Sequence, residues 1–76
     1  MKNYKLSIAY YDTGRVYFTV ETAEDLREYR TNQRGEGLWL VSDVADKQIR
    51  GTCQFSTTGN RSTDRRTFIR ELMLDE

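Results

Sequence analysis

The chain has 76 residues, enough for one small domain but too few for a cofactor-binding domain together with a substrate domain. Apolar residues make up 37% of it and charged residues 32%, and the 12 basic residues balance the 12 acids, so the high net charge typical of disordered chains is missing. The chain has no His and a single Cys, which excludes a histidine base, a disulfide framework and a multi-thiolate metal site. We therefore expect residues 1–76 to form one globular domain that is not an enzyme and uses no cofactor.

The first predicted element is a β-hairpin. Apolar and polar residues alternate over residues 4–11 and again over residues 16–20, which is the period of a half-buried strand. Between them, Asp12, Thr13 and Gly14 suit a three-residue loop in which the glycine adopts the left-handed backbone conformation. A loop of this length pairs the inward-facing residues of the two strands: Leu6 with Val20, Ile8 with Phe18 and Tyr10 with Val16.

The next segment has the features of a helix N-terminus. Thr22 can cap, and Glu24 and Asp25 place negative charge in the first turn, where the helix dipole favours it. Asp25 also occupies the position of the acid in a capping box. We predict a helix of about three turns that ends near residues 32–34, with Gly35 as the stop.

Two further strands are predicted, over residues 38–42 and 49–55. The register that we favour pairs Val44 with Ile49, Leu40 with Cys53 and Leu38 with Phe55. It places Trp39 on the polar face and Cys53 in the core, so we do not interpret the cysteine as a nucleophile. The other register uses a five-residue loop and pairs Val41 with Ile49 and Trp39 with Gly51.

A second helix is predicted from a cap at Ser62 or Thr63 to about Leu74. Its apolar residues form one stripe, which consists of Phe68, Ile69, Leu72 and Met73. We expect Phe68 and Leu72 to share one core with Phe18 and Phe55. The element order is then ββαββα, and the simplest packing is an α+β fold with a four-stranded antiparallel sheet and both helices packed on one face.

The triplet Asp12-Thr13-Gly14 resembles the Asp-Thr-Gly triplet of the aspartic proteases, whose chemistry needs two carboxylates that share a proton. The resemblance implies a compulsory dimer in which each chain contributes one Asp. It covers only these three residues. Arg15 follows where the family has a small residue, and the chain has no counterpart of the family's later apolar-apolar-Gly segment. We therefore interpret the triplet as a hairpin turn.

Basic residues are concentrated in the second half of the chain. Residues 47–70 carry one acid, Asp64, and six basic residues: Lys47, Arg50, Arg61, Arg65, Arg66 and Arg70. Arg61, Arg65 and Arg66 fall at the start of the predicted second helix, where positive charge opposes the dipole. Arg65 projects near the centre of the apolar stripe, so it has to extend along the sheet or reach a partner. These arginines either pair with Asp64, Glu24 and Glu28 on a solvated surface or form a contact patch.

Aromatic residues form the second candidate surface. Tyr11 and Tyr17 are predicted on the hairpin face away from the core, and Trp39 joins them in the favoured register. Tyr, Trp and Arg are the residue types enriched at binding hot spots. The three rings either cover a thin second face of the sheet or serve as an interface.

We expect a small non-enzymatic protein-binding module that uses this Arg and aromatic surface against an acidic surface of another protein. In size and style it is similar to phage and mobile-element inhibitors of host defence, including anti-CRISPR proteins, although it shares no motif with them. The alternative is a nucleic-acid-binding protein that uses the patch from Arg61 to Arg70, although the neutral overall charge disfavours it. No stretch resembles a signal peptide or a membrane span, so we expect a cytoplasmic protein, in the host cytoplasm if phage-encoded, with no membrane partner.

Overall fold

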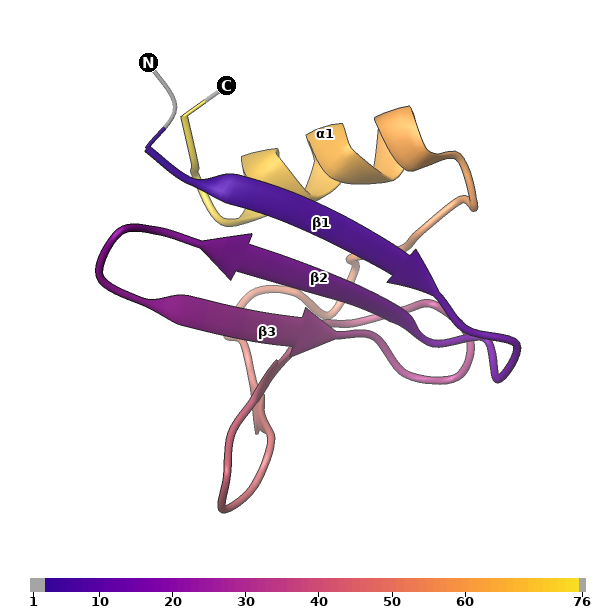
Figure 1. Ribbon diagram of the computed structural model, residues 1–76. Coiled ribbons are helices and arrows are strands. Elements are labelled where there is room, and N and C mark those ends of the chain that lie inside the picture. Colours follow the sequence, from indigo (N-terminus) through magenta and orange to yellow (C-terminus); the bar gives the residue numbers. More distant parts are fainter. Residues whose placement is uncertain (1–2, 76) are drawn as a thin grey trace.

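The structure is a computed structural model that describes residues 3–75; residues 1, 2 and 76 of the predicted domain lie outside the described residues. It contains an antiparallel sheet of five strands in the order β1-β2-β3-β4-β5 and one helix, α1 (Figure 1). The elements are β1 (Lys5–Tyr10), β2 (Val16–Glu21), β3 (Leu26–Arg30), β4 (Trp39–Val41), β5 (Lys47–Gln48) and α1 (Arg61–Glu71). The fold is α+β, but the predicted four-stranded sheet with two helices is wrong.

The first hairpin has the predicted register. Leu6 pairs with Val20, Ile8 with Phe18 and Tyr10 with Val16. The Tyr11 N–H donates to the Arg15 carbonyl at 3.0 Å, and Gly14, at a φ of +97°, donates its N–H to the Tyr11 carbonyl. The interpretation of the Asp12 triplet as a turn is therefore confirmed.

The helix predicted after Thr22 is wrong, because this segment forms a tight turn and then β3. The Asp25 N–H does donate to the Thr22 hydroxyl at 3.0 Å, as in a helix cap, but the Thr22 N–H donates back to the Asp25 carbonyl at 2.8 Å. The chain therefore reverses, and Leu26–Arg30 pairs with β2 on one side and with β4 on the other. Pairing on both sides satisfies the backbone groups of β3, which a short isolated helix could not do as well.

The strand predicted over residues 49–55 is also wrong. β5 is only two residues long and pairs Trp39 with Gln48 and Leu40 with Lys47, so neither predicted register is correct. After β5 the chain makes two turns, closed by bonds from the Thr52 N–H to the Ile49 carbonyl and from the Phe55 N–H to the Thr52 carbonyl. Gly51, at a φ of +85°, breaks the extended conformation. Consequently Cys53 is exposed and not in the core.

The core lies between the sheet and α1. Phe68 of α1 is fully buried and stacks on Phe18 of β2, with the ring centroids 4.3 Å apart. Phe55 and Tyr29 meet these rings edge-on, and Leu72 packs against the same cluster. The predicted core of Phe18, Phe55, Phe68 and Leu72 is therefore confirmed.

Two details of the helix differ from the prediction. The cap is Asn60 instead of Ser62 or Thr63, and its side-chain oxygen accepts from the Thr63 N–H at 3.0 Å. Met73 is 88% exposed, because the helix ends before it and the residue takes a left-handed φ of 57°. The apolar stripe of the helix is therefore shorter than predicted.

Candidate protein-interaction surface

Two arginines of the predicted patch contact the edge of the sheet. An Arg61 Nη donates to the Ile8 carbonyl, and an Arg65 Nη donates to the Leu6 carbonyl at 3.3 Å. The Arg61 guanidinium also lies over the Tyr10 ring, 5.2 Å from its centroid. Among residues 3–75 neither arginine forms an ion pair, so the alternative in which they pair with Asp64, Glu24 or Glu28 does not hold for these two. Arg65 extends to the sheet, one of the two outcomes predicted for it.

The other predicted cations are dispersed. Arg66 and Arg70 are exposed on α1, and Arg50 is exposed in the turn that follows β5. None of the three forms an ion pair within residues 3–75. Arg70 lies in the last turn of α1, where the helix dipole favours a cation, so that position has a structural explanation. A role of these three residues in binding stays a prediction.

Asp64, the acid within the basic segment, is buried at the start of α1. Its carboxylate accepts from the Tyr10 hydroxyl at 2.7 Å, from the Thr58 N–H at 2.7 Å and from the Gly59 N–H at 3.0 Å. Burial raises the pKa of Asp64, but these hydrogen bonds outweigh burial and the net pKa is lowered. Burial and the bond to Asp64 raise the pKa of Tyr10 to about 12. The hydrogen bond between the Tyr10 hydroxyl and the Asp64 carboxylate therefore attaches α1 to β1.

The face of the sheet opposite α1 collects the predicted aromatic residues. Cα pairing places Tyr17, Arg30 and Trp39 side by side across β2, β3 and β4. Tyr11 packs on Tyr17, with the ring centroids 4.7 Å apart, and the Arg30 guanidinium lies over the Trp39 ring at 5.3 Å. We call this side, defined by Tyr11, Tyr17, Arg30 and Trp39, the outer face. Phe68 of α1 packs on Phe18 and Tyr29, whose side chains point to the opposite face, and Figure 1 shows α1 running along β1.

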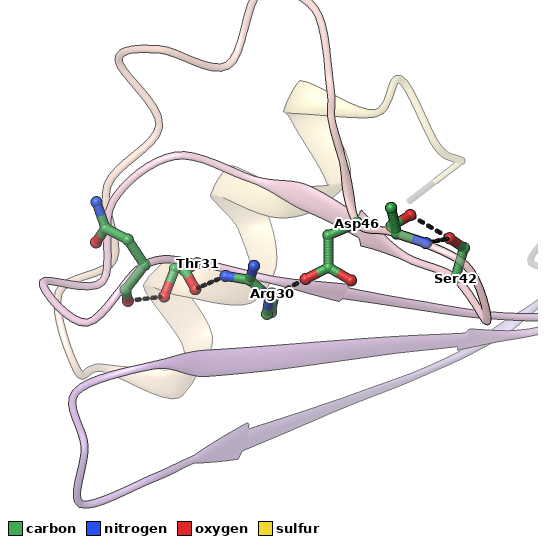
Figure 2. Close-up of polar contacts among 6 residues, drawn as sticks. Arg30, Thr31, Ser42 and Asp46 are labelled. Atoms are coloured by element: carbon green, nitrogen blue, oxygen red, sulfur yellow. Dashed lines mark hydrogen bonds and ion pairs between the residues drawn. The ribbon is translucent and has the colours of Figure 1, made fainter.

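Arg30 is held at the centre of the outer face by contacts from three directions. Its Nε donates to the Asp46 carboxylate and an Nη donates to the Thr31 carbonyl at 3.2 Å (Figure 2). The ion pair is well shielded, with 19% of the Arg30 side chain and 27% of the Asp46 side chain exposed. The third contact is the Trp39 ring. The guanidinium is therefore fixed before any partner arrives.

Tight turns support both neighbours of Arg30. The Ser42 hydroxyl accepts from the Ala45 N–H at 3.1 Å and closes the turn that presents Asp46 (Figure 2). The Trp39 ring packs so closely on Gly37, which has a φ of +70°, that a Cβ there would lie 2.8 Å from the ring. A larger residue at position 37 would therefore displace the ring.

Sequence reasoning missed Arg30 because it assigned the residue to a helix. Had residues 26–30 been interpreted as a strand with Tyr29 inward, the alternation of side chains would have placed Arg30 outward. The signal was weak, since Tyr29 is the one inward-facing apolar residue of that strand. The ion pair between Asp46 and Arg30 could not be predicted without the correct β4–β5 register.

No family model, curated protein or solved structure matches the chain. Within residues 3–75 no group of three or more His, Cys, Asp or Glu side chains could hold a metal ion. The helical segment in that range is too short and too polar to cross a membrane.

Proposed function

We propose that this protein is a small non-enzymatic binding module whose protein partner docks on the outer face. The observation that supports it best is the fixed Arg30 beside the Trp39 ring, on a face that α1 does not cover. Tyr17 and Tyr11 extend the same surface toward the first turn. Trp, Tyr and Arg are the residues that most often dominate binding energies at protein interfaces.

Rigidity of the outer face favours binding. A side chain that is already immobile loses little conformational entropy when a partner covers it. Arg30 is immobilised by Asp46 and the Thr31 carbonyl, and Trp39 is packed on Gly37. The cost of ordering these groups is met during folding, so more of the contact energy is available to the complex.

The partner surface that fits is apolar at its centre and carries carboxylates. Arg30 uses Nε for Asp46 and one Nη for Thr31, and its second Nη has no hydrogen bond within residues 3–75. Arg15 follows the first turn beside Tyr11, and it forms no ion pair within the described residues. Both guanidinium groups can donate to a carboxylate, which would pair with them in the bidentate geometry that Arg favours.

Nucleic acid fits the outer face less well. Sequence-tolerant binding of single strands needs open aromatic faces and a strongly basic groove. Here Arg30 already lies over the Trp39 ring, Tyr11 packs on Tyr17, and the chain is neutral overall. Inhibition of a host defence system, as by anti-CRISPR proteins, stays a prediction that rests on the small size of the chain and on its Arg and aromatic surface.

The test is a selection of random displayed peptides on the immobilised protein. We expect enrichment of peptides that combine Asp or Glu with apolar residues. A Tyr11→Ser/Trp39→Ser variant removes two rings and should weaken binding of the selected peptides by about thirtyfold or more, since a single hot-spot contact contributes about 2 kcal/mol. The matched control, Arg66→Ala/Arg70→Ala, changes two exposed residues of α1 and should bind the peptides like the parent protein if the outer face is the site, whereas weaker binding would favour the arginine patch predicted from the sequence.

Circular dichroism and urea unfolding verify that both variants are folded before binding is compared. Failure to enrich any peptide, or equal binding by the outer-face variant, would contradict the proposal. Preferential binding of single-stranded oligonucleotides in fluorescence anisotropy, with affinity falling steeply as salt rises, would replace it by the nucleic-acid alternative.

A further inference from the structure

The two edges of the sheet are very different. β5 is two residues long, and such a short edge offers little for another strand to pair with. β1 is six residues long and lies at the other edge. A long unpaired edge is a template for pairing with another chain, and proteins usually protect it.

The backbone groups that β1 presents at this edge belong to its even-numbered residues. Tyr11 and Arg15 form a hydrogen-bonded pair next to the turn, so bonded and non-bonded pairs alternate along the hairpin from there. Leu6 and Ile8 fall at non-bonded pairs, and their N–H and carbonyl groups point away from β2. A strand added at this edge would have to donate hydrogen bonds to these two carbonyls.

The guanidinium groups of Arg65 and Arg61 already donate hydrogen bonds to these two carbonyls. Arg65 donates to Leu6 and Arg61 donates to Ile8, so α1 runs antiparallel to β1. The spacing of the two elements matches, because four residues of helix rise about 6 Å and two residues of strand span about 6.8 Å. Two arginines one helical turn apart can therefore reach successive outward carbonyls of a strand.

The helix is attached at the same place by other contacts. The Tyr10 hydroxyl donates to the buried Asp64 carboxylate, and the Arg61 guanidinium covers the Tyr10 ring. These contacts give a reason for arginines at a helix start, where the dipole disfavours them. Their guanidinium groups donate hydrogen bonds to carbonyl oxygens of β1.

We propose that Arg61 and Arg65 form a clamp that closes the β1 edge to strand addition by a second copy of this chain. The occupant excluded is β1 of the other copy, because β1 is the one long strand at an edge and would pair with itself in an antiparallel, two-fold arrangement. The guanidinium groups occupy the acceptor sites that such pairing needs. This role is independent of the outer face and of the proposed function.

The test compares Arg61→Ala/Arg65→Ala with the matched control Arg66→Ala/Arg70→Ala, which removes the same number of charges from the same helix. Light scattering coupled to size-exclusion chromatography should show twice the mass of the parent protein, or more, for the clamp variant only. Hydrogen exchange at the Leu6 and Ile8 amides should slow at the same protein concentration, because pairing would cover them.

If the two arginines had a purely structural role, hydrogen exchange at the Leu6 and Ile8 amides would become faster instead of slower in the variant. If the arginines only attach α1, their loss should leave the mass unchanged and speed exchange at Leu6 and Ile8, and that result would overturn the proposal. Should the double variant fail to fold, Arg65→Ala alone removes the longer of the two contacts and is judged by the same two measurements. An unchanged mass with unchanged or faster exchange in that variant also overturns the clamp.

Discussion

Two segments of this chain begin with the same hydrogen bond and become different structures. At Thr22–Asp25 the Asp25 N–H donates to the Thr22 side chain at 3.0 Å, and at Asn60–Thr63 the Thr63 N–H donates to the Asn60 side chain at 3.0 Å. Both are the bond from a cap residue to the third residue after it. The first segment reverses into β3 and the second continues as α1. A capping bond therefore permits a helix without determining one.

The difference lies in what each segment packs against. After Asp25, Tyr29 is the one large apolar side chain directed at the core, and β2 offers a free backbone edge alongside. After Thr63, Phe68 and Ile69 are adjacent and buried, a pattern that suits the face of a helix. Backbone pairing determines the first outcome, and burial of a helical face determines the second.

The largest expected loss of stability comes from removing the aromatic ring that packs each segment into the core. Phe68→Ala, and to a similar extent Tyr29→Ala, should cost about 3–5 kcal/mol, near the whole stability of so small a domain. Urea unfolding measures it. The matched controls are Met73→Ala and Leu26→Ala, at 88% and 63% exposure, and they should stay within about 0.5 kcal/mol of the parent. Near-native stability of Phe68→Ala would show that α1 does not dock as described.

Asp64 is a further difference between the two segments, because the described residues of the first segment have no counterpart of this buried carboxylate. Asp64→Asn should cost about 3 kcal/mol at neutral pH, since charge-assisted bonds from Tyr10, Thr58 and Gly59 are lost or weakened. The pKa of Asp64 is lowered on folding, so its contribution is complete above the unfolded pKa of about 4 and declines as the pH falls through the folded pKa. Urea unfolding of the Asn variant should therefore respond less to acid than the parent; an equal response would contradict this.

Tyr10 gives the complementary effect at high pH. Folding raises the pKa of Tyr10 from 10.0 to about 12, so the stability that it contributes is complete below pH 10 and is lost as the pH rises through this range. Tyr10→Phe should remove that alkaline loss. Denaturant midpoints measured between pH 9 and about pH 12 test this, and an unchanged slope in the Phe variant would contradict it.

Gly14 tests how the end of β3 is held. A Cβ at Gly14 would lie 2.0 Å from the Gln33 carbonyl oxygen, and the residue has a φ of +97°. Gly14→Val should cost about 2 kcal/mol or more, from the left-handed conformation and the collision with backbone. Gly59→Val is the control, since Gly59 has a similar φ of +87° but open space around it. Unfolding midpoints that shift equally in both variants would mean that the contact with Gln33 contributes nothing.

The smallest expected effects come from the caps themselves. Asn60→Ala and Thr22→Ala should each cost about 1 kcal/mol, measured by urea unfolding. Far-ultraviolet circular dichroism should show a slight loss of helix for the first variant and no change for the second, since Thr22 precedes a strand. A loss of helical signal in Thr22→Ala would contradict the assignment of residues 26–30 to β3.

Local pattern was sufficient for the first hairpin, its register and the burial of Phe18 and Phe68, whereas Phe55 is buried although the strand that was predicted to carry it is wrong. In residues 4–20 the alternation, the loop length and Gly14 all require the same pairing, and only neighbouring residues are involved. The same alternation placed Tyr11 and Tyr17 away from the core. Trp39 was placed on that face only through the favoured register of residues 38–55, which is wrong, so its position beside Arg30 comes from the β3–β4 pairing. Whether any of them binds a partner stays a prediction.

Tertiary structure alone decided the fate of residues 22–34, the β4–β5 register and the partners of the arginines. Thr22 and Asp25 form the same local bond in a turn as in a helix, and only the free edge of β2 distinguishes the two outcomes. Arg30 and Asp46 meet through pairings that the local pattern did not specify. Arg61 and Arg65 bind carbonyls that lie 53 and 59 residues away, because helix and strand spacings match. Such contacts depend on the free energy of distant elements packing together, which no short stretch of sequence contains.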